Sequence, residues 1–194
     1  MFYHDFEGYI QPSVEEVNFF GDIYRVTRPG NTGDGYLQGF EVGYQQFYDN
    51  LPGILGGLGL QANYTYMDGD TTNLDTGIEQ AITGLSNNSY NIILLYERER
   101  FSGRLAYNWR DEFLDVRNIA AGYDLYVAET EQLDGQISYG VSDNITVSLE
   151  AINMLDTEFK DFFVDPNNPQ LTGLFPRDTR RYDRTFLLGV RVGF

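Results

Sequence analysis

Acidic residues in one segment of this sequence have a spacing that could bind a cation. Asp68-Gly69-Asp70, followed by Asp75, offers carboxylate oxygens, which are ligands that Ca²⁺ prefers. The segment lacks the full spacing of an EF-hand loop, and Asp and Gly also supply turn geometry. Short acidic motifs often match by chance, so we favour a polar loop tip over a metal site.

A second group of charged residues lies near the C-terminal end. It contains four arginines and two aspartates: Arg177, Asp178, Arg180, Arg181, Asp183 and Arg184. Guanidinium groups could bind lipopolysaccharide phosphates or another anionic ligand. Charge runs are more often solvated and ion-paired, with little energetic effect, and we favour that interpretation.

Aromatic residues also occur in segments that show no strand pattern. They are Tyr123, Phe162, Phe163 and Phe175. Such rings could stack on the sugar rings of a ligand, or they could pack the loops on one another. The sequence does not distinguish between these two roles.

Enzymatic chemistry finds little support, and we predict neither an enzyme nor a cofactor. A glycosidase needs two carboxylates held across its substrate, and nothing fixes such a pair among the 29 Asp and Glu residues. No nucleophile elbow, phosphate loop or metal motif is present. Cysteine is absent and His4 is the single histidine, which excludes thiolate and multi-histidine metal centres. The net charge of -16 argues against nucleic acid as a partner.

Alternation of apolar and polar residues is the pattern that must position these side chains. It predicts an all-β chain with an antiparallel meander of about eight strands. Their approximate ranges are 1–10, 36–48, 58–68, 90–98, 101–110, 132–141, 145–151 and 182–194. Ile93 and Leu95 interrupt the pattern, because they fall on the face that should be polar. Helix signals are weak, although a short helical turn within a long loop is compatible with the sequence.

The alternation divides the strand residues into two faces. On the apolar face, which we expect to contact lipid, lie Leu60, Tyr64, Leu105, Tyr107, Ile137, Leu149, Leu188 and Val190. On the polar face, which we expect to line a lumen, lie Gln61, Asn63, Asn91, Arg104, Asn108, Gln136, Glu150 and Arg191. A dry core would leave these polar groups without partners, so this face needs a water-filled or plugged interior.

Tyrosine and tryptophan on the apolar face suit a membrane–water interface. The aromatic residues assigned to this face, including the C-terminal phenylalanine, are Tyr44, Tyr48, Tyr64, Tyr66, Tyr107, Trp109, Tyr139 and Phe194. Residues of this kind near strand ends form aromatic girdles in membrane barrels. The alternative is that they are ordinary aromatic residues of a sheet core.

The predicted connections alternate between short and long. Short ones are centred on Leu51-Pro52-Gly53, Glu99-Arg100 and Ser142-Asp143-Asn144. Long polar ones cover roughly residues 11–34, 69–85, 116–129 and 156–180. Short turns at one end and long loops at the other are typical of bacterial outer-membrane barrels. Mean hydropathy, which is -0.36, does not detect such barrels because their strands average out.

The first residues of the chain have the pattern of a strand. Residues 1–6 lack the basic and apolar regions of a signal peptide. We therefore expect a piece of a longer protein, whose leader and first domain precede Met1.

Several stretches resemble the C-terminal third of TonB-dependent outer-membrane receptors. The most specific is GFEVGYQQFYDNLPGILGGLGLQANYTYMD, from Gly39 to Asp68. Further matching stretches cover residues 84–91, 104–110, 134–139, 150–156 and 182–185. The terminal strand also resembles the signal that the barrel-assembly machinery reads, with Gly189, Val192 and Phe194 at matching spacing. Leu187 departs from that signal, because a polar residue is usual at its position.

The resemblance implies that residues 1–194 are the C-terminal part of a 22-stranded transmembrane β-barrel, without its plug domain and N-terminal strands. Such receptors import nutrients across the outer membrane of Gram-negative bacteria with energy delivered by TonB, which this chain would reach only through the missing N-terminal part. The implied partners are outer-membrane lipid, lipopolysaccharide and the barrel-assembly machinery. Within the family the chain looks most like receptors tied to the uptake of carbohydrate oligomers, so the implied ligand is a carbohydrate oligomer, with a siderophore as the main competitor.

Two alternatives to a transport segment are compatible with the pattern. One is a self-contained eight-stranded outer-membrane barrel that acts as an anchor or adhesin, which requires the first strand to pair with the last. The other is a soluble carbohydrate-binding β-sandwich, which requires the apolar face to be buried between two sheets.

Overall fold

The computed structural model describes residues 1–73, 77, 79–120, 122–165, 168 and 175–193. Their elements in chain order are β1 (Phe2–Phe19), β2 (Asp22–Phe47), η1 (Gly53–Gly57), β3 (Leu58–Asn73), β4 (Glu79–Ala81), β5 (Asn88–Arg98), β6 (Phe101–Arg110), β7 (Phe113–Ala120), β8 (Tyr123–Val127), β9 (Thr130–Ser142), β10 (Ile145–Ile152), β11 (Glu158–Val164), β12 (Phe175–Arg181) and β13 (Thr185–Val192). All observed strand pairings are antiparallel, which confirms the predicted fold class.

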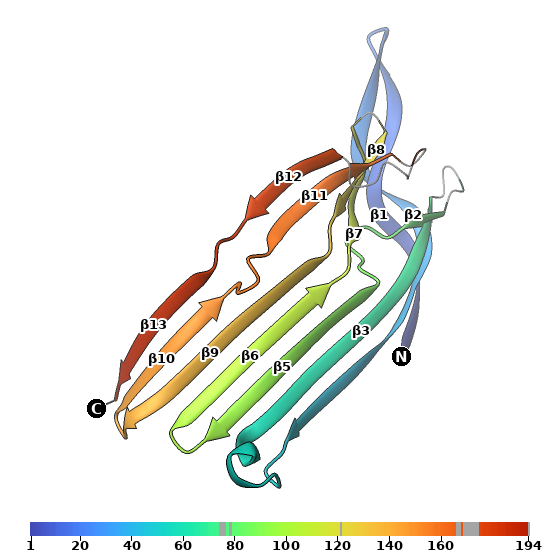
Figure 1. Ribbon diagram of the computed structural model, residues 1–194. Helices are drawn as coiled ribbons and strands as arrows, with labels where there is room; N and C mark the ends of the chain where they lie inside the picture. Colours follow the sequence, from blue (N-terminus) through green and yellow to red (C-terminus); the bar gives the residue numbers. More distant parts are fainter. Residues whose placement is uncertain (74–76, 78, 121, 166–167, 169–174, 194) are drawn as a thin grey trace.

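Eight strands form one continuous meander, in the order β1-β2-β3-β5-β6-β9-β10-β13, and β4 is attached to β3 (Figure 1). These eight are the strands that the alternation predicts. Within the described residues, β1 and β13 are the two opposite edges of this sheet, and no pairing joins them. The arrangement therefore lacks the closure that a self-contained eight-stranded barrel requires.

The short connections lie together at one end of the meander, as predicted. Glu99 and Arg100 form the turn between β5 and β6, and Glu99 adopts a positive φ of 53°. The connection from β2 to β3 holds η1, a 3-10 helix that follows Pro52. This helical turn lies in a short connection, whereas the sequence was compatible with one in a long loop. None of the helices among the described residues is long and apolar enough to cross a membrane.

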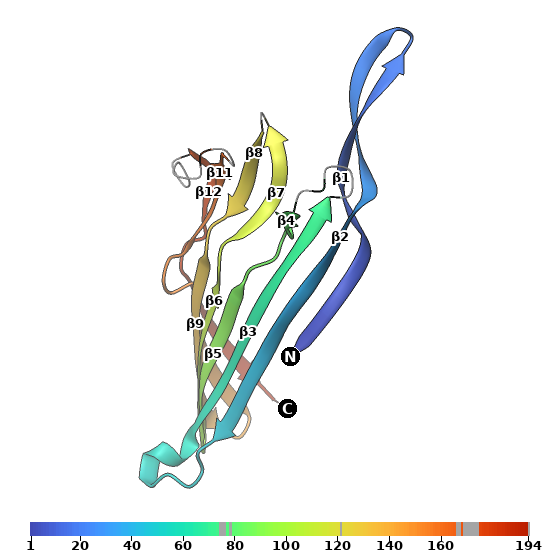
Figure 2. The same cartoon turned by 90° about the vertical axis from the view of Figure 1, so that its right-hand side faces the viewer.

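The long connections are not irregular loops, and in this respect the sequence interpretation was wrong. The first one is the outer half of a β-hairpin, in which β1 and β2 pair as far as Phe19 and Asp22. The third and fourth contribute β7, β8, β11 and β12 to a separate four-stranded sheet in the order β12-β11-β8-β7. We call it the small sheet. Its strands and the β1–β2 ribbon extend beyond the end of the meander opposite the short turns (Figures 1 and 2).

The main sheet is bowed, and little of it is buried. Figure 2 shows β5, β6 and β9 on one side, while β2 and the C-terminal end curve away to the other. The buried apolar side chains of the small sheet include Leu114, Leu125 and Val127. On the main sheet, the apolar face remains exposed, with Leu188 at 76% and Ile137 at 49%. The small sheet leaves these side chains uncovered, so the arrangement is not a β-sandwich.

Candidate functional site

The polar face of the main sheet is organised in rows that run across the strands. Asn63, Asn91, Asn108 and Gln132 are direct cross-strand partners in turn, so they form one row on a single face. Within it, Asn91 Nδ2 donates a hydrogen bond to Asn108 Oδ1. Side-chain amides in such a row present both donors and acceptors toward the interior of the bow.

A second row lies closer to the short turns. Arg104, Gln136 and Glu150 are consecutive cross-strand partners, and Gln136 Nε2 donates to Glu150 Oε1 at 3.0 Å. One step further, the hydroxyls of Ser102 and Ser138 are 2.7 Å apart. The row continues the polar surface down the sheet.

All eight residues predicted for the polar face lie on this side of the sheet. Ile93 and Leu95, the two apolar residues that interrupt the alternation, lie there too. Ile93 pairs with Gln61 on one side and with Ala106 on the other. Ile93 and Ala106 are buried, with 8% and 2% of their surfaces exposed. Both are therefore shielded from solvent within an otherwise polar face.

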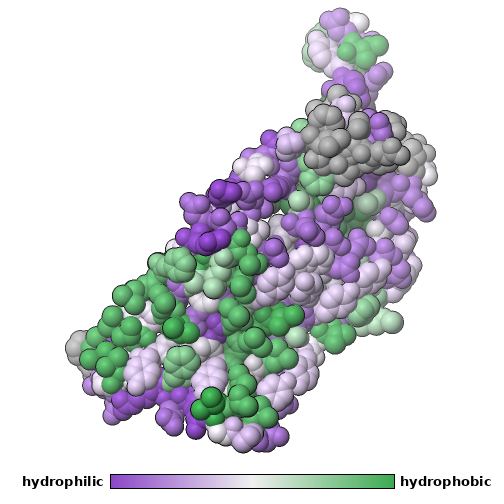
Figure 3. Space-filling model, viewed as in Figure 1, coloured by the Kyte–Doolittle hydropathy of each residue, from purple (hydrophilic) through white to green (hydrophobic). Residues whose placement is uncertain are grey.

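The opposite face is apolar and open. The register places all eight predicted apolar residues on it, because Leu60 pairs with Leu94, Leu94 with Leu105, and Leu149 with both Ile137 and Leu188. Hydrophobic side chains gather over the lower part of the bow, and hydrophilic ones over the small sheet (Figure 3). An exposed apolar surface of this extent requires a partner that is not water.

Aromatic side chains cross the apolar face near the end that carries the small sheet. Tyr90 stacks on Trp109 with ring centroids 5.2 Å apart, and Tyr107 lies 5.9 Å from Tyr90. The Tyr107 hydroxyl donates to Glu131 Oε2 at 2.7 Å. These rings thus have an apolar body on the sheet and a polar contact at its end, as in an interfacial girdle.

The distance between the aromatic residues at the two ends of β6 is close to the height of the apolar band of a membrane barrel. Phe101 lies on the same face as Trp109, eight residues away along β6. At ~3.4 Å per residue this is about 27 Å along the strand, and a tilt of about 40° reduces it to about 21 Å. The apolar band of outer-membrane barrels is about 25 Å tall.

An open pocket of about 530 Å³ lies above the polar rows, where β6, β9 and β10 meet the connection to β11. Its lining includes Asn108, Gln132, Thr157, Phe159 and Tyr182. The amides supply hydrogen bonds and the rings supply stacking surface, so the pocket can bind a polar ligand with flat apolar faces. The sequence interpretation missed both Phe159 and Tyr182 as pocket residues, because Phe159 falls in a predicted long connection and Tyr182 was assigned to the apolar-faced last strand.

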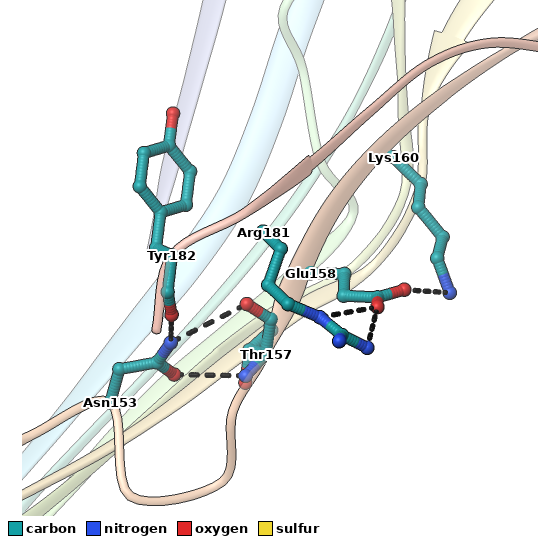
Figure 4. Close-up of polar contacts among 6 residues, drawn as sticks. All are labelled: Asn153, Thr157, Glu158, Lys160, Arg181 and Tyr182. Atoms are coloured by element: carbon teal, nitrogen blue, oxygen red, sulfur yellow. Dashed lines mark hydrogen bonds and ion pairs between the residues drawn. The ribbon is translucent and has the colours of Figure 1, made fainter. Parts of the chain in front are cut away.

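One asparagine joins the main sheet to the small sheet, a role that the sequence interpretation did not predict. Asn153 follows β10, has a φ of 55° and is 7% exposed. Its Oδ1 accepts from the Thr157 backbone N–H at 2.9 Å, and its Nδ2 donates to the backbone carbonyl of Tyr182 (Figure 4). Its own N–H donates to Asp134 Oδ1 at 2.9 Å. Asn153 therefore forms hydrogen bonds with β9 and with the residues that connect to β11 and β13.

The arginine cluster lies largely in β12, and three of its arginines form ion pairs. Arg181 Nη2 is 2.5 Å from Glu158 Oε1, and Lys160 Nζ is 3.0 Å from Glu158 Oε2 (Figure 4). The Lys160 ammonium and then the Arg181 guanidinium hold the pKa of Glu158 below its ordinary value. Arg180 pairs with Asp178 at 2.7 Å, and Arg177 lies 3.6 Å from the buried Asp161. The favoured ion-paired interpretation holds for them, although the segment is a strand and not a loop.

The aromatic residues of the small sheet pack on one another. Tyr126 stacks on Phe162 with centroids 6.1 Å apart, and Tyr123 contacts Phe163 at 6.4 Å. The side chain of Phe175 lies outside the described residues. For Phe162, Phe163 and Tyr123 the structure therefore shows packing.

The acidic segment is part of β3 and not a loop tip. Asp68 accepts from Gln38 Nε2 at 3.1 Å, and Asp70 accepts from the Tyr36 hydroxyl at 3.4 Å. Asp75 lies outside the described residues. Elsewhere in the part of the chain that the structure describes, no group of three acidic, histidine or cysteine side chains could hold a metal ion.

The proposed assembly signal falls at the edge of the main sheet. Gly189 and Val192 belong to β13, and Phe194 lies outside the described residues. Leu187 pairs with Glu150 and therefore lies on the polar face. A Cβ at position 189 would lie 2.6 Å from Ser148 Oγ, so a larger residue there would require the Ser148 hydroxyl to rotate away.

Comparisons with known proteins agree with this geometry. The fold is similar to the crystal structure of the siderophore receptor PiuA from Acinetobacter baumannii, with a TM-score of 0.57 and 15% sequence identity, over 84% of this chain and 22% of that chain. A search of curated proteins found no match. A family model described as "TonB dependent receptor-like, beta-barrel" matches residues 1–154. With most of its length covered by that match, the chain belongs to the TonB-dependent receptor-like β-barrel family.

Proposed function

We propose that this chain forms part of the wall of a nutrient receptor in the outer membrane, with its polar face toward the lumen and its apolar face toward lipid. Members of the family are outer-membrane transporters and not enzymes. The observation that carries the proposal is the division of one bowed sheet into an exposed apolar face and a face of polar rows. In lipid, the apolar face needs no cover, and the polar face can solvate a passage.

The ligand is proposed to pass the pocket beside Phe159 and Tyr182 on its way to the lumen. Its chemical class is a carbohydrate oligomer or a siderophore, both of which combine hydrogen-bonding groups with flat surfaces. The similar fold is that of a siderophore receptor, and this is the support for the second class.

The partners follow from this placement. Outer-membrane lipid would cover the apolar face, and lipopolysaccharide would surround the small sheet. The barrel-assembly machinery would read the β13 edge, and TonB would act through other parts of the receptor. The chain spans 22% of the length of the similar receptor, so these interactions are proposed for a larger assembly that contains it.

Single-cysteine labelling tests the proposal directly, since the chain contains no cysteine. Gln61→Cys and Leu60→Cys are neighbours on opposite faces of β3. In outer-membrane vesicles, a water-soluble maleimide should modify Gln61→Cys, and a lipid-soluble maleimide should modify Leu60→Cys. Equal modification of both positions by the water-soluble reagent would exclude the assignment of the faces.

A further inference from the structure

Two glycines form the floor of a groove on the apolar face. Gly103 lies on β6 between Tyr96 and Ile137, and Gly135 lies on β9 beside Leu105. An added Cβ at Gly103 would be in ordinary van der Waals contact with Phe101 and Ile137, at 3.7 and 3.8 Å, and one at Gly135 would lie 3.3 Å from Met154 Sδ. The neighbouring side chains form the walls of an open hollow of about 400 Å³.

The groove continues to the end of the sheet that carries the short turns. A second hollow of about 500 Å³ is lined by Ile54, Leu55 and Phe101, and it shares Leu58 and Tyr96 with the first. The 3-10 helix is fixed beside it, because the Tyr96 hydroxyl donates to the Ile54 carbonyl at 3.0 Å. Ile54 and Leu55 are exposed, at 73% and 46%. The shared residues make the two hollows one apolar groove.

A cation lies at the open end of this groove. Arg98 lines the second hollow and donates one hydrogen bond, from Nη1 to the Gly53 carbonyl at 2.5 Å. Its neighbour Glu99 is 4.0 Å away with a side chain that is 83% exposed, so this ion pair is weak. A guanidinium has five N–H donors, and Arg98 therefore keeps donors for a phosphate.

We propose that the groove binds one phospholipid of the periplasmic leaflet, with an acyl chain over Gly103 and Gly135 and its phosphate beside Arg98. The inference rests on the proposed function, because it requires this face to lie in the membrane. From Arg98 to the level of Leu94 and Gly135 is four residues along β5, or about 14 Å at ~3.4 Å per residue, and a tilt of about 40° reduces this to about 10 Å of depth. Half of the ~30 Å hydrocarbon core is about 15 Å, so both ends of the groove lie within one leaflet.

An acyl chain bound in the groove makes more contacts with the protein than the acyl chains of the surrounding lipid. Over the glycine floor it touches backbone below and side chains on both sides, whereas a chain on a flat face has contacts on one side. Packing of this kind drives association in membranes, where the hydrophobic effect between apolar surfaces is absent.

The test uses the full chain in vesicles of phosphatidylethanolamine and phosphatidylglycerol that contain spin-labelled phosphatidylglycerol. Gly103→Leu fills the groove with a side chain that the open space admits. Val42→Leu is the matched control, because Val42 lies on the same face outside the groove and is 58% exposed. Arg98→Gln tests the headgroup contact and keeps a donor for Gly53.

Spin resonance should show a motionally restricted lipid for the unmodified chain, about fivefold weaker binding for Gly103→Leu, and no change for Val42→Leu. Arg98→Gln should remove the preference for spin-labelled phosphatidylglycerol over spin-labelled phosphatidylethanolamine in the same vesicles. Insertion is measured in the same vesicles by labelling Leu60→Cys.

Normal insertion of Gly103→Leu with lipid binding equal to that of the unmodified chain would overturn this inference alone. A change in oligomeric state by Gly103→Leu with lipid binding unchanged would assign the groove to a second copy and overturn it too. Modification of Leu60→Cys by a water-soluble maleimide in the inserted chain would overturn the proposed function as well, because it would place the apolar face in water.

Discussion

Asn153 shows how much of this molecule depends on one side chain. Its amide contacts backbone groups at Thr157 and Tyr182, and its N–H contacts Asp134. Asparagine tolerates a positive φ better than most residues, and the two terminal atoms of its amide can donate and accept at once. No other side chain of similar size combines the two properties.

Replacing this residue should loosen the small sheet and leave the main sheet intact. Asn153→Ala removes the side-chain hydrogen bonds and leaves buried backbone groups unpaired, which we expect to destabilise the small sheet by about 2–4 kcal/mol. Limited proteolysis of the β11–β12 segment measures the effect. Asn153→Gly serves as the control, because it relieves the positive φ but also lacks the amide. If Asn153→Gly is as resistant as the unmodified chain, the hydrogen bonds are not responsible.

A neighbouring pair on β3 tests the two faces at the same depth. Leu60→Arg should impair membrane insertion by about 2–4 kcal/mol if the residue is near the middle of the bilayer, and Gln61→Arg should be milder. Val190→Arg on β13 should behave like Leu60→Arg, because Val190 lies on the apolar face and is 64% exposed. Recovery of folded protein from outer membranes gives the comparison. Equal tolerance at all three positions would contradict the assignment of faces.

At the scale of elements, β11 and β12 are linked by a titratable contact. The pKa of Glu158 is lowered in the folded chain by Lys160 and Arg181. A depressed folded-state pKa means that the stabilisation is present above the unfolded value of about 4.3 and is lost as the pH falls through the folded value. The β11–β12 pairing should therefore weaken on acidification below about pH 4.3.

Proteolysis of β11 by an acid-stable protease, measured between neutral and acidic pH, follows this change. Glu158→Gln removes the titrating group and should flatten this part of the pH dependence. A pH profile of the variant that matches the unmodified chain would show that another group is responsible.

Strands were predictable from sequence where their two faces meet different surroundings. The alternation in Leu58–Asp68 identifies β3 because one face is apolar and the other polar. The outer part of the β1–β2 ribbon and strands such as β12 have polar residues on both sides, so the same pattern is absent and they read as loops. Asn153 escaped prediction for another reason, since its three partners are brought together only by the folded chain.

The whole molecule is an open sheet with two edges. Among the described strands, β1 and β13 each have one neighbour, which leaves a row of backbone groups on each edge without a partner strand. Such groups cannot remain unpaired in lipid, so each edge needs another strand beside it. The bow of the sheet separates the two edges, so we expect those strands to come from outside residues 1–194.

Disulfide trapping distinguishes the two ways of completing the edges. We expect the variant with Tyr3→Cys on β1 and Val190→Cys on β13, which lie on the same face of the sheet, to give cross-linked dimers and larger species when it is refolded in detergent. Each single variant, which can form only symmetric dimers, is the control. A cross-linked monomer with altered mobility would instead show that the eight strands close on themselves.

The β1–β2 ribbon has a consequence for how other agents meet the cell. Among the described residues no third strand pairs with it beyond Gly33, and from Tyr9 to Phe19 it extends about 33 Å at ~3.3 Å per residue. At its tip Phe20 is 94% exposed and Ile23 is 69% exposed. In the proposed orientation, this tip protrudes from the bacterial surface. It would be the first part of the chain that an antibody or a phage tail fibre contacts.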